Sequence, residues 1–185
     1  VKTGPAATWT GRPPPVASAL PLPEPRMPTP METTLVLVKP DGVQRGLIGE
    51  ILGRMERKGL QITGMKLAKV PRAVFERHYE AHKAKKFFAG LVEFMSSSPC
   101  VVLAVKGIES IKIVRAMMGA TFGKDALPGT VRGDLAISSS YNLVHSSDSA
   151  EAAARELAIF FQPGEVLDFP IGNRDWIYDV KAELS

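Results

Sequence analysis

The segment 142–149 places a histidine between an apolar stretch and the start of a predicted helix. Asp148, followed three residues later by Glu151, resembles a capping box and predicts that helix start. Free backbone amides at a helix N-terminus attract phosphate. A neutral imidazole at His145 has one ring nitrogen with a lone pair for attack, and Glu156 is a candidate acceptor for the other nitrogen. Taken alone, His145 also fits a structural role.

Several cationic and hydroxyl side chains upstream are suited to bind phosphate oxygens. Thr121 and Arg132 lie in the segment 120–134, which lacks periodicity and contains glycines and prolines, and Arg115 precedes it. Long irregular loops in compact domains are usually functional. A guanidinium group donates two parallel hydrogen bonds to phosphate, and Lys39 adds a cation at the end of a predicted strand. The alternative is that each is an ordinary surface charge.

Three further residue types could take part in chemistry. His78 and His82 have the i, i+4 spacing that can bind zinc, but they lack the intervening glutamate of a zinc-protease helix, so a metal site is the minor alternative. Phe87 fits either a core position or an aromatic platform. The single cysteine, Cys100, excludes a disulfide framework. The sequence contains no P-loop, dinucleotide-binding or serine-hydrolase motif.

Composition limits the class of protein. The chain has 185 residues, 45% hydrophobic and 23% charged, which suits one compact domain with an appendage. The net charge is +4, and the one tight basic cluster, at residues 83–86, indicates a solvated face in preference to a nucleic-acid site. No stretch reaches the ~18–20 apolar residues that span a bilayer, so no membrane partner is expected.

Prolines divide the chain. Nine of the 15 prolines lie in residues 1–30, which predicts an extended, largely disordered tail before a folded domain at 31–185. This tail is upstream sequence before a natural start at Met31, a targeting peptide or a flexible extension. Its apolar run is short for a secretory signal, and two arginines are few for a mitochondrial presequence. A cytoplasmic location is therefore expected.

Apolar periodicity predicts an α+β domain. The predicted strands are 34–39, 60–70, 100–105 and 135–138, and the predicted helices are 47–55, 72–81, 87–95, 111–118 and one beginning at Asp148. Strands and helices do not alternate strictly. The order favours a ferredoxin-like four-stranded antiparallel sheet with helices packed on one face.

Five blocks in order carry a resemblance to a known family. Residues 38–50 (VKPDGVQRGLIGE), 87–92 (FFAGLV), 128–134 (PGTVRGD), 142–149 (NLVHSSDS) and 175–178 (DWIY) are similar to the corresponding segments of nucleoside diphosphate kinases. The match covers residues 31–178, which is nearly the whole predicted domain.

This resemblance implies a ferredoxin-like fold and a ping-pong transfer of the γ-phosphate of ATP, or another nucleoside triphosphate, to a nucleoside diphosphate. His145 matches the residue that is phosphorylated, and Glu156 matches the residue that orients its ring. Ser147 matches a serine bonded to that glutamate, and Tyr79 a tyrosine near the histidine. The residues that match nucleotide-binding positions are Lys39, Phe87, Arg115, Thr121, Arg132 and Asn142.

The resemblance also implies magnesium that enters with the nucleotide, no protein metal site, and a homohexamer, with a tetramer as the alternative. Departures from the family pattern are Ser140, Tyr141, Ser146, Lys86 and the segment 122–124. Ser146 replaces a glycine and would be strained if that position needs a positive φ. Two rival functions are a nucleic-acid or regulatory binding module on the same fold and a protein-histidine kinase.

Overall fold

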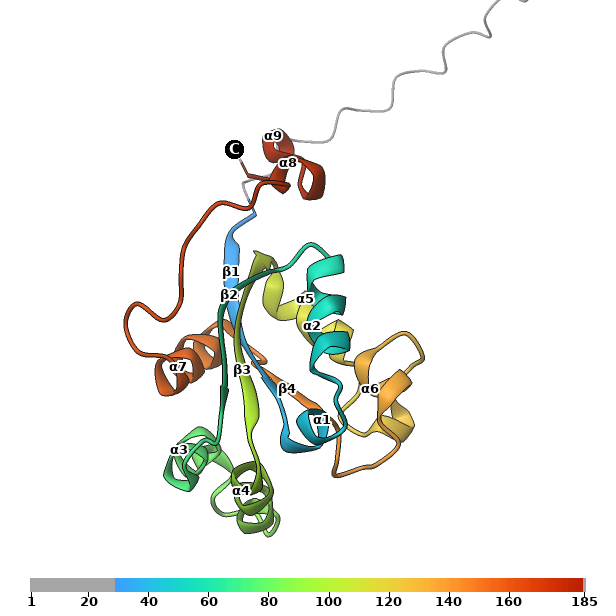
Figure 1. The fold of residues 1–185 in the computed structure, drawn as a ribbon, viewed down its shortest axis with the longest axis vertical. Helices are drawn as coiled ribbons and strands as arrows, with labels where there is room; N and C mark the ends of the chain where they lie inside the picture. The colour runs from blue at the N-terminus through green and yellow to red at the C-terminus, as the bar shows by residue number, and fades with distance from the viewer. Residues whose placement is uncertain (1–28, 185) are drawn as a thin grey trace, which may run out of the picture.

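A four-stranded antiparallel sheet forms the centre of the protein, as the sequence predicts. The computed structural model describes residues 29–184, so most of the predicted tail lies outside the described residues. The strand order is β2-β3-β1-β4 (Figure 1). The four strands are β1 (Met31–Val38), β2 (Gln61–Ala68), β3 (Cys100–Ile108) and β4 (Val144–Ser146).

Helices cover both faces of this sheet. The helices are α1 (Pro40–Gln44), α2 (Ile48–Arg57), α3 (Arg72–His78), α4 (Phe88–Ser97), α5 (Ser110–Met118), α6 (Val131–Leu135), α7 (Ala150–Phe160), α8 (Arg174–Ile177) and α9 (Val180–Glu183). Two short 3-10 helices, η1 (Glu80–His82) and η2 (Gly123–Asp125), lie between them.

The prediction that helices pack on one face is wrong. Successive side chains of a strand point to opposite faces, and in β1 Val36 and Val38 pack against α2 and α5, whereas Leu35 and Leu37 pack against α3, α4 and α7. Figure 1 shows α2 and α5 on one side of the sheet and α3 and α7 on the other. All four of these side chains are fully buried. A continuous apolar run is typical of a strand covered on both faces, and β1 and β3 are such strands.

The predicted fourth strand at 135–138 is also wrong. The chain there leaves α6, which Thr130 caps by accepting a hydrogen bond from Gly133 N at 3.0 Å. The fourth strand is β4, which pairs antiparallel with β1 so that His145 lies opposite Leu37. With three residues, β4 is too short to show a periodicity of its own. The segment predicted as one irregular loop, 120–134, contains η2 and most of α6.

Helix ends follow local backbone chemistry. Helix α2 ends before Gly59, whose φ of 89° suits glycine. Helix α3 ends at His78, three residues earlier than predicted, because the chain turns into η1. Helix α7 is capped by Ser149, whose Oγ accepts a hydrogen bond from Ala152 N at 3.1 Å. The prediction of Asp148 as the cap is therefore wrong by one residue.

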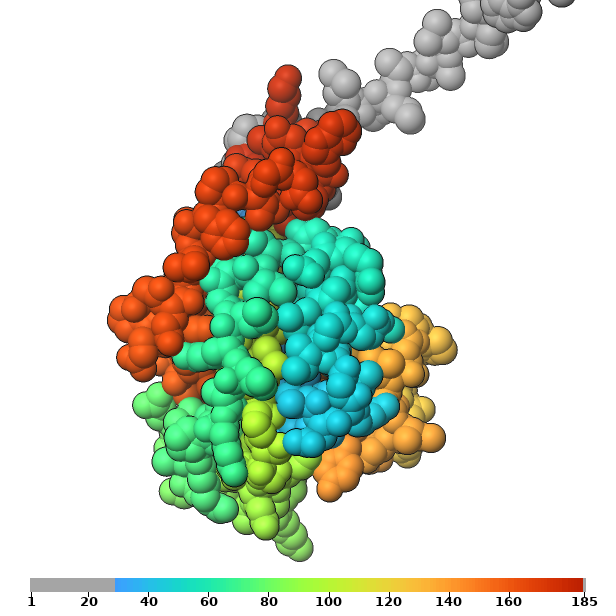
Figure 2. All heavy atoms as spheres, viewed as in Figure 1, coloured from blue at the N-terminus to red at the C-terminus, as the bar shows by residue number. Residues whose placement is uncertain are grey.

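The C-terminal segment runs from α7 along one side of the molecule to the end where β1 begins (Figure 2). Backbone hydrogen bonds attach it there: Leu167 N donates to Thr63 O on β2, and Thr29 N donates to Glu183 O on α9. Tyr178 OH donates to Gly59 O at 3.2 Å. Within residues 29–184, no helix is both long enough and apolar enough to cross a membrane.

The cap of α7 gives a test of its assignment. Replacing Ser149 with Ala removes the acceptor for Ala152 N, and we expect the free energy of unfolding to fall by about 1 kcal/mol in urea denaturation. The matched control is Asp148→Ala, which removes a neighbouring side chain that does not cap the helix, so its loss should be smaller. A larger loss in Asp148→Ala than in Ser149→Ala would contradict this assignment.

Candidate active site

A cavity of about 960 Å³ gathers nearly all the residues that the sequence singles out. It lies between α3, the start of α4, residues 121–122, α6, α7 and the chain around β4. Ser147 stands just behind the wall, bonded to Glu156. The predicted site residues that line the cavity are Lys39, Tyr79, Phe87, Arg115, Thr121, Arg132, Asn142, His145 and Glu156.

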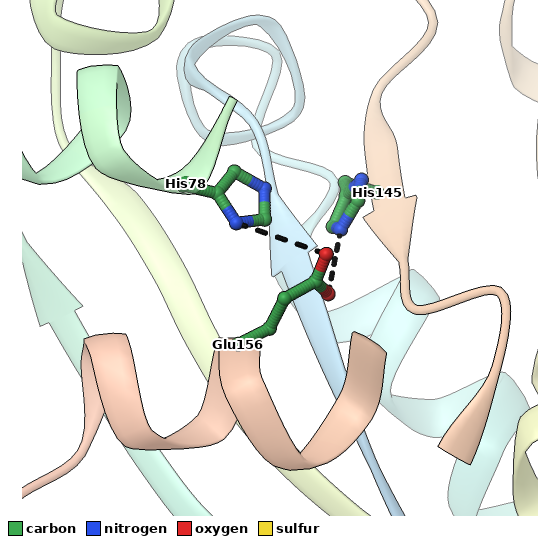
Figure 3. A group of neighbouring side chains, drawn as sticks. All are labelled: His78, His145 and Glu156. Atoms are coloured by element: carbon green, nitrogen blue, oxygen red, sulfur yellow. Dashed lines mark hydrogen bonds and ion pairs between the residues drawn. The ribbon is translucent and has the colours of Figure 1, made fainter. Parts of the chain in front are cut away.

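The imidazole of His145 is held by a buried carboxylate. Its Nε2 lies 3.1 Å from Glu156 Oε2 on α7 (Figure 3). Ser147 Oγ donates to the same oxygen at 2.7 Å, and accepts a hydrogen bond from Leu35 N at 3.3 Å. One hydroxyl therefore connects β1, β4 and α7 at this point.

The ionisation of Glu156 decides which nitrogen of His145 is free. Burial raises the pKa of this carboxyl, but the hydrogen bond and charge of His145 and the hydrogen bond from Ser147 outweigh burial, and the net pKa is lowered. A carboxylate can only accept hydrogen bonds, so it favours the proton of His145 on Nε2. The lone pair of the neutral ring then lies on Nδ1, away from Glu156.

His78 lies beside this pair, and sequence reasoning missed its place. It is 3% exposed, and its Nδ1 is 3.8 Å from Glu156 Oε1 (Figure 3). Its ring meets that of His145 edge-on at 4.7 Å. Burial, and next the charge of His145, lowers the pKa of His78 to about 3, so its imidazole is neutral. The i, i+4 spacing points to His82 as its partner, but the groups around it are His145 and Glu156.

Tyr79 packs beside the two histidines and also lines the cavity. Its ring lies 4.3 Å from that of His78 and 6.2 Å from that of His145, and the residue is 8% exposed. Burial raises the pKa of its phenol, so the hydroxyl stays protonated. Tyr79 therefore packs against the two histidines as an uncharged aromatic side chain.

Lys39 and Asn142 join the end of β1 to the cavity wall. Lys39 Nζ donates to Asn142 Oδ1 at 2.6 Å, and Asn142 Nδ2 donates to Thr121 O at 2.7 Å. Burial lowers the pKa of Lys39, and the nearby negative charge of Asp41 raises it. Burial has the larger effect, so the pKa falls to about 8. The lysine therefore provides a poorly hydrated cation, which binds anions strongly.

The two arginines have different roles. Arg132 donates to four backbone carbonyl oxygens, those of Gly119, Ala120, Asn142 and Val144, at 2.8–3.3 Å. It is buried, and burial together with the charge of Arg115 lowers its pKa to about 10. Arg115 is exposed at the cavity. Arg132 thus holds the loop that carries its neighbours, while Arg115 is available to a ligand.

Aromatic side chains form the mouth of the cavity. Phe87 is 53% exposed, with His82 at 5.8 Å between ring centroids. Tyr141, a departure from the family pattern, packs on Phe94 at 5.0 Å, and both line the same cavity. No signal in the sequence predicts the pairing of Tyr141 with Phe94, because the two residues are far apart in the chain.

The glycine-to-serine departure at Ser146 carries no backbone strain. Ser146 lies in the extended strand β4, opposite Val36. The unusual backbone is instead at Leu143, with a φ of 68°, directly before β4. Its N–H donates to Asp41 Oδ2 at 3.0 Å, and its side chain is fully buried. Such conformations cost about 1–3 kcal/mol and persist where the surroundings enforce them.

Comparison with known proteins identifies the family. The family model described as nucleoside diphosphate kinase matches residues 32–166. The chain belongs to this family. Nucleoside diphosphate kinases from Archaeoglobus fulgidus and Thermus thermophilus are 48% and 52% identical to it, over 80% and 74% of this chain and 99% and 100% of theirs. It is accordingly a phosphotransferase.

Solved structures agree with this membership of the nucleoside diphosphate kinase family. A halophilic nucleoside diphosphate kinase from Halobacterium salinarum in complex with CDP superposes with a TM-score of 0.78, at 44% identity, over 80% of this chain and 98% of that one. A family member from Babesia bovis gives 0.77, also at 44% identity, over 80% and 99%. The predicted ferredoxin-like fold is therefore confirmed.

The burial of Lys39 predicts a pH-dependent stability. Between about pH 8 and pH 10.5 the unfolded chain keeps a proton on this amine that the folded protein has released, so the free energy of unfolding rises with pH. Lys39→Met lacks this contribution. In urea denaturation across this window, we expect the wild type to gain on the order of 2 kcal/mol relative to Lys39→Met. A difference that does not change with pH would contradict the lowered pKa.

Proposed function

We propose that this enzyme transfers the γ-phosphate of a nucleoside triphosphate to a nucleoside diphosphate through a phosphohistidine at His145. The observation that carries the proposal is the bond between His145 Nε2 and the ionised, buried Glu156, which leaves Nδ1 as the nucleophilic nitrogen at the cavity. A nucleophile oriented by a second group, which a third group orients in turn, is the arrangement that covalent catalysis uses. Here the third group is Ser147.

The proposed reaction has two half-reactions at one nitrogen. In the first, the lone pair of Nδ1 attacks the γ-phosphorus, the bond from that phosphorus to its bridging oxygen breaks, and the nucleoside diphosphate leaves. In the second, an oxygen of the terminal phosphate of another nucleoside diphosphate attacks the phosphorus, and the P–N bond breaks with its electron pair returning to Nδ1. Glu156 stabilises the positive charge that the imidazole gains on phosphorylation, because its carboxylate accepts a hydrogen bond from Nε2–H.

The other cavity residues suit the binding of a nucleotide. Phosphoryl transfer depends mainly on positioning and charge stabilisation. Lys39, Arg115 and Arg132 supply positive charge, and Thr121 and Asn142 supply polar groups beside them. The exposed ring of Phe87 offers a surface on which any base can stack, which supports broad nucleotide use. CDP, which the Halobacterium salinarum relative binds, is a nucleotide of this kind.

We infer that magnesium accompanies the nucleotide. The cavity holds cations and amides, and its acidic lining residues are Glu156, which is engaged by His145 and Ser147, and the exposed Asp148. This donor set fits an ion carried mainly by phosphate oxygens and water, with Asp148 as the carboxylate able to hold it. When bound, the ion neutralises phosphate charge. The chain's own residues bind, align and receive the phosphoryl group.

We also propose a cytoplasmic homo-oligomer, a hexamer or a tetramer. Self-association is supported by β2, an edge strand of the sheet that exposes Met65 and Leu67, each more than half accessible. An apolar edge strand is suited to pair with another chain. Light scattering of the purified chain distinguishes the two assemblies.

The phosphohistidine is tested by labelling with γ-labelled ATP. The wild type should take up label that is acid-labile and stable to base, and His145→Ala should take up none. The matched control is His82→Ala, which removes another histidine of the same cavity that lies outside the group formed by His145, His78 and Glu156, and it should label normally. Label that persists in His145→Ala would contradict the proposed nucleophile.

The different contacts of the arginines give a second test. Arg115→Ala should lower turnover by ~10²–10³-fold with an unchanged Tm, because Arg115 is exposed at the cavity, where its guanidinium can bind phosphate. Arg132→Ala should lose turnover and also about 2–4 kcal/mol of stability, because it leaves buried carbonyl oxygens without donors. Thermal unfolding and steady-state kinetics measure both. Equal stability of the two variants would show that the hydrogen bonds of Arg132 contribute little.

A further inference from the structure

The neighbourhood of His145 contains a set of possible metal ligands, one of which, His78, has no role in the proposed phosphoryl transfer. His78, His145 and Glu156 each offer one ligand atom, and within residues 29–184 these atoms all lie within 4.8 Å of one another (Figure 3). His78 is only 3% exposed, and neither of its ring nitrogens has a hydrogen-bond partner among the described residues. A buried imidazole without a partner loses its hydrogen bonds with water and gains none in return.

We propose that His78, His145 and Glu156 form a binding site for a Zn²⁺ ion that blocks phosphorylation of His145. Two imidazoles and a carboxylate are a known zinc ligand set, and hard cations such as Mg²⁺ disfavour it. Ligand atoms around tetrahedral zinc lie roughly 3.4 Å apart, given bonds of ~2.1 Å. The ligand atoms here lie within 4.8 Å of one another, so zinc binding needs side-chain movements of up to roughly 1.5 Å between them. The blocking effect rests on the proposed role of His145; the ligand set does not.

The structure suggests how the ion inhibits. Zinc bound to His145 would use Nε2, the nitrogen that faces Glu156 at 3.1 Å. A neutral imidazole has one nitrogen with a lone pair and one with a proton. When Nε2 gives its proton to solvent and binds zinc, the ring takes a proton from solvent at Nδ1. The Nδ1 lone pair is then no longer available to attack phosphorus, and Glu156 no longer accepts a hydrogen bond from Nε2–H.

The ion can reach this set from the cavity. All three residues line the cavity, and the His145 side chain is 23% exposed there, which leaves space for water as a fourth ligand. One charge opposes binding: Arg155 Nη2 lies 3.7 Å from Glu156 Oε1. The Arg155 side chain is half exposed, so it can turn into solvent when the ion binds.

Direct zinc binding is the first test. Metal-free full-length protein is titrated with ZnCl₂ by calorimetry, and we expect one ion per chain in the wild type. In His78→Phe the affinity should fall at least ~10-fold, since one ligand is removed. Phenylalanine keeps the ring next to the aromatic side chains of Tyr79 and Phe160. The matched control, His82→Ala, should bind as the wild type. Equal zinc affinity in His78→Phe and the wild type overturns the proposal.

A second measurement uses the wild type alone, so it tests the zinc site even if the His78→Phe variant fails to fold. X-ray absorption at the zinc edge should show two imidazole ligands with oxygen for the remainder, and a spectrum with fewer than two imidazoles overturns the site. Labelling with γ-labelled ATP separates the two claims. A wild type that takes up label and binds no zinc overturns only this inference. A chain that binds zinc through His78 and takes up no label overturns the proposed function and leaves the site.

Discussion

The site is organised around one buried negative charge. Glu156 lies on α7, and its carboxylate is bonded by His145 and Ser147 and approached by His78. A carboxylate in such a place is stable only if these partners compensate for the lost hydration. The positions of α7, of β4 and of the hydroxyl bonded to β1 are therefore linked, because a shift of any one would leave this charge without a partner.

Local patterns predict the parts of the fold that rest on local chemistry. The long apolar runs of β1 and β3 and the helices α2, α4 and α5 are found close to where the periodicity places them. The errors occur where tertiary contacts decide. The short strand β4 exists because β1 pairs with it, and helices cover both faces because β1 is apolar on both sides. At the start of α7 two adjacent residues, Asp148 and Ser149, are both favourable N-cap residues, so residue type alone does not predict which of them caps the helix.

The candidate site shows the same division. His145 and Asn142 lie in one contiguous motif, and both line the cavity, so a motif indicates which neighbours along the chain come together. The place of His78 could not, since it depends on how α3 packs beside α7 and β4. The hydrogen bonds of Arg132 to backbone carbonyl oxygens also could not be predicted. The positions of those oxygens depend on the folded backbone and not on the types of side chain in the sequence. Sequence thus predicts which groups are present more readily than which of them a ligand can reach.

The position of His145 on a three-residue edge strand has a consequence for local motion. Few backbone hydrogen bonds hold β4 to β1, so the strand itself resists opening only weakly. Side chains hold its first end: Asp41 accepts from Leu143 N before the strand, and Arg132 donates to Val144 O within it. After the strand, Ser147 exchanges hydrogen bonds with Leu35. Amide exchange of this segment would therefore report on those side chains as well as on the sheet, and His145 would become more mobile through changes at Asp41 or Arg132.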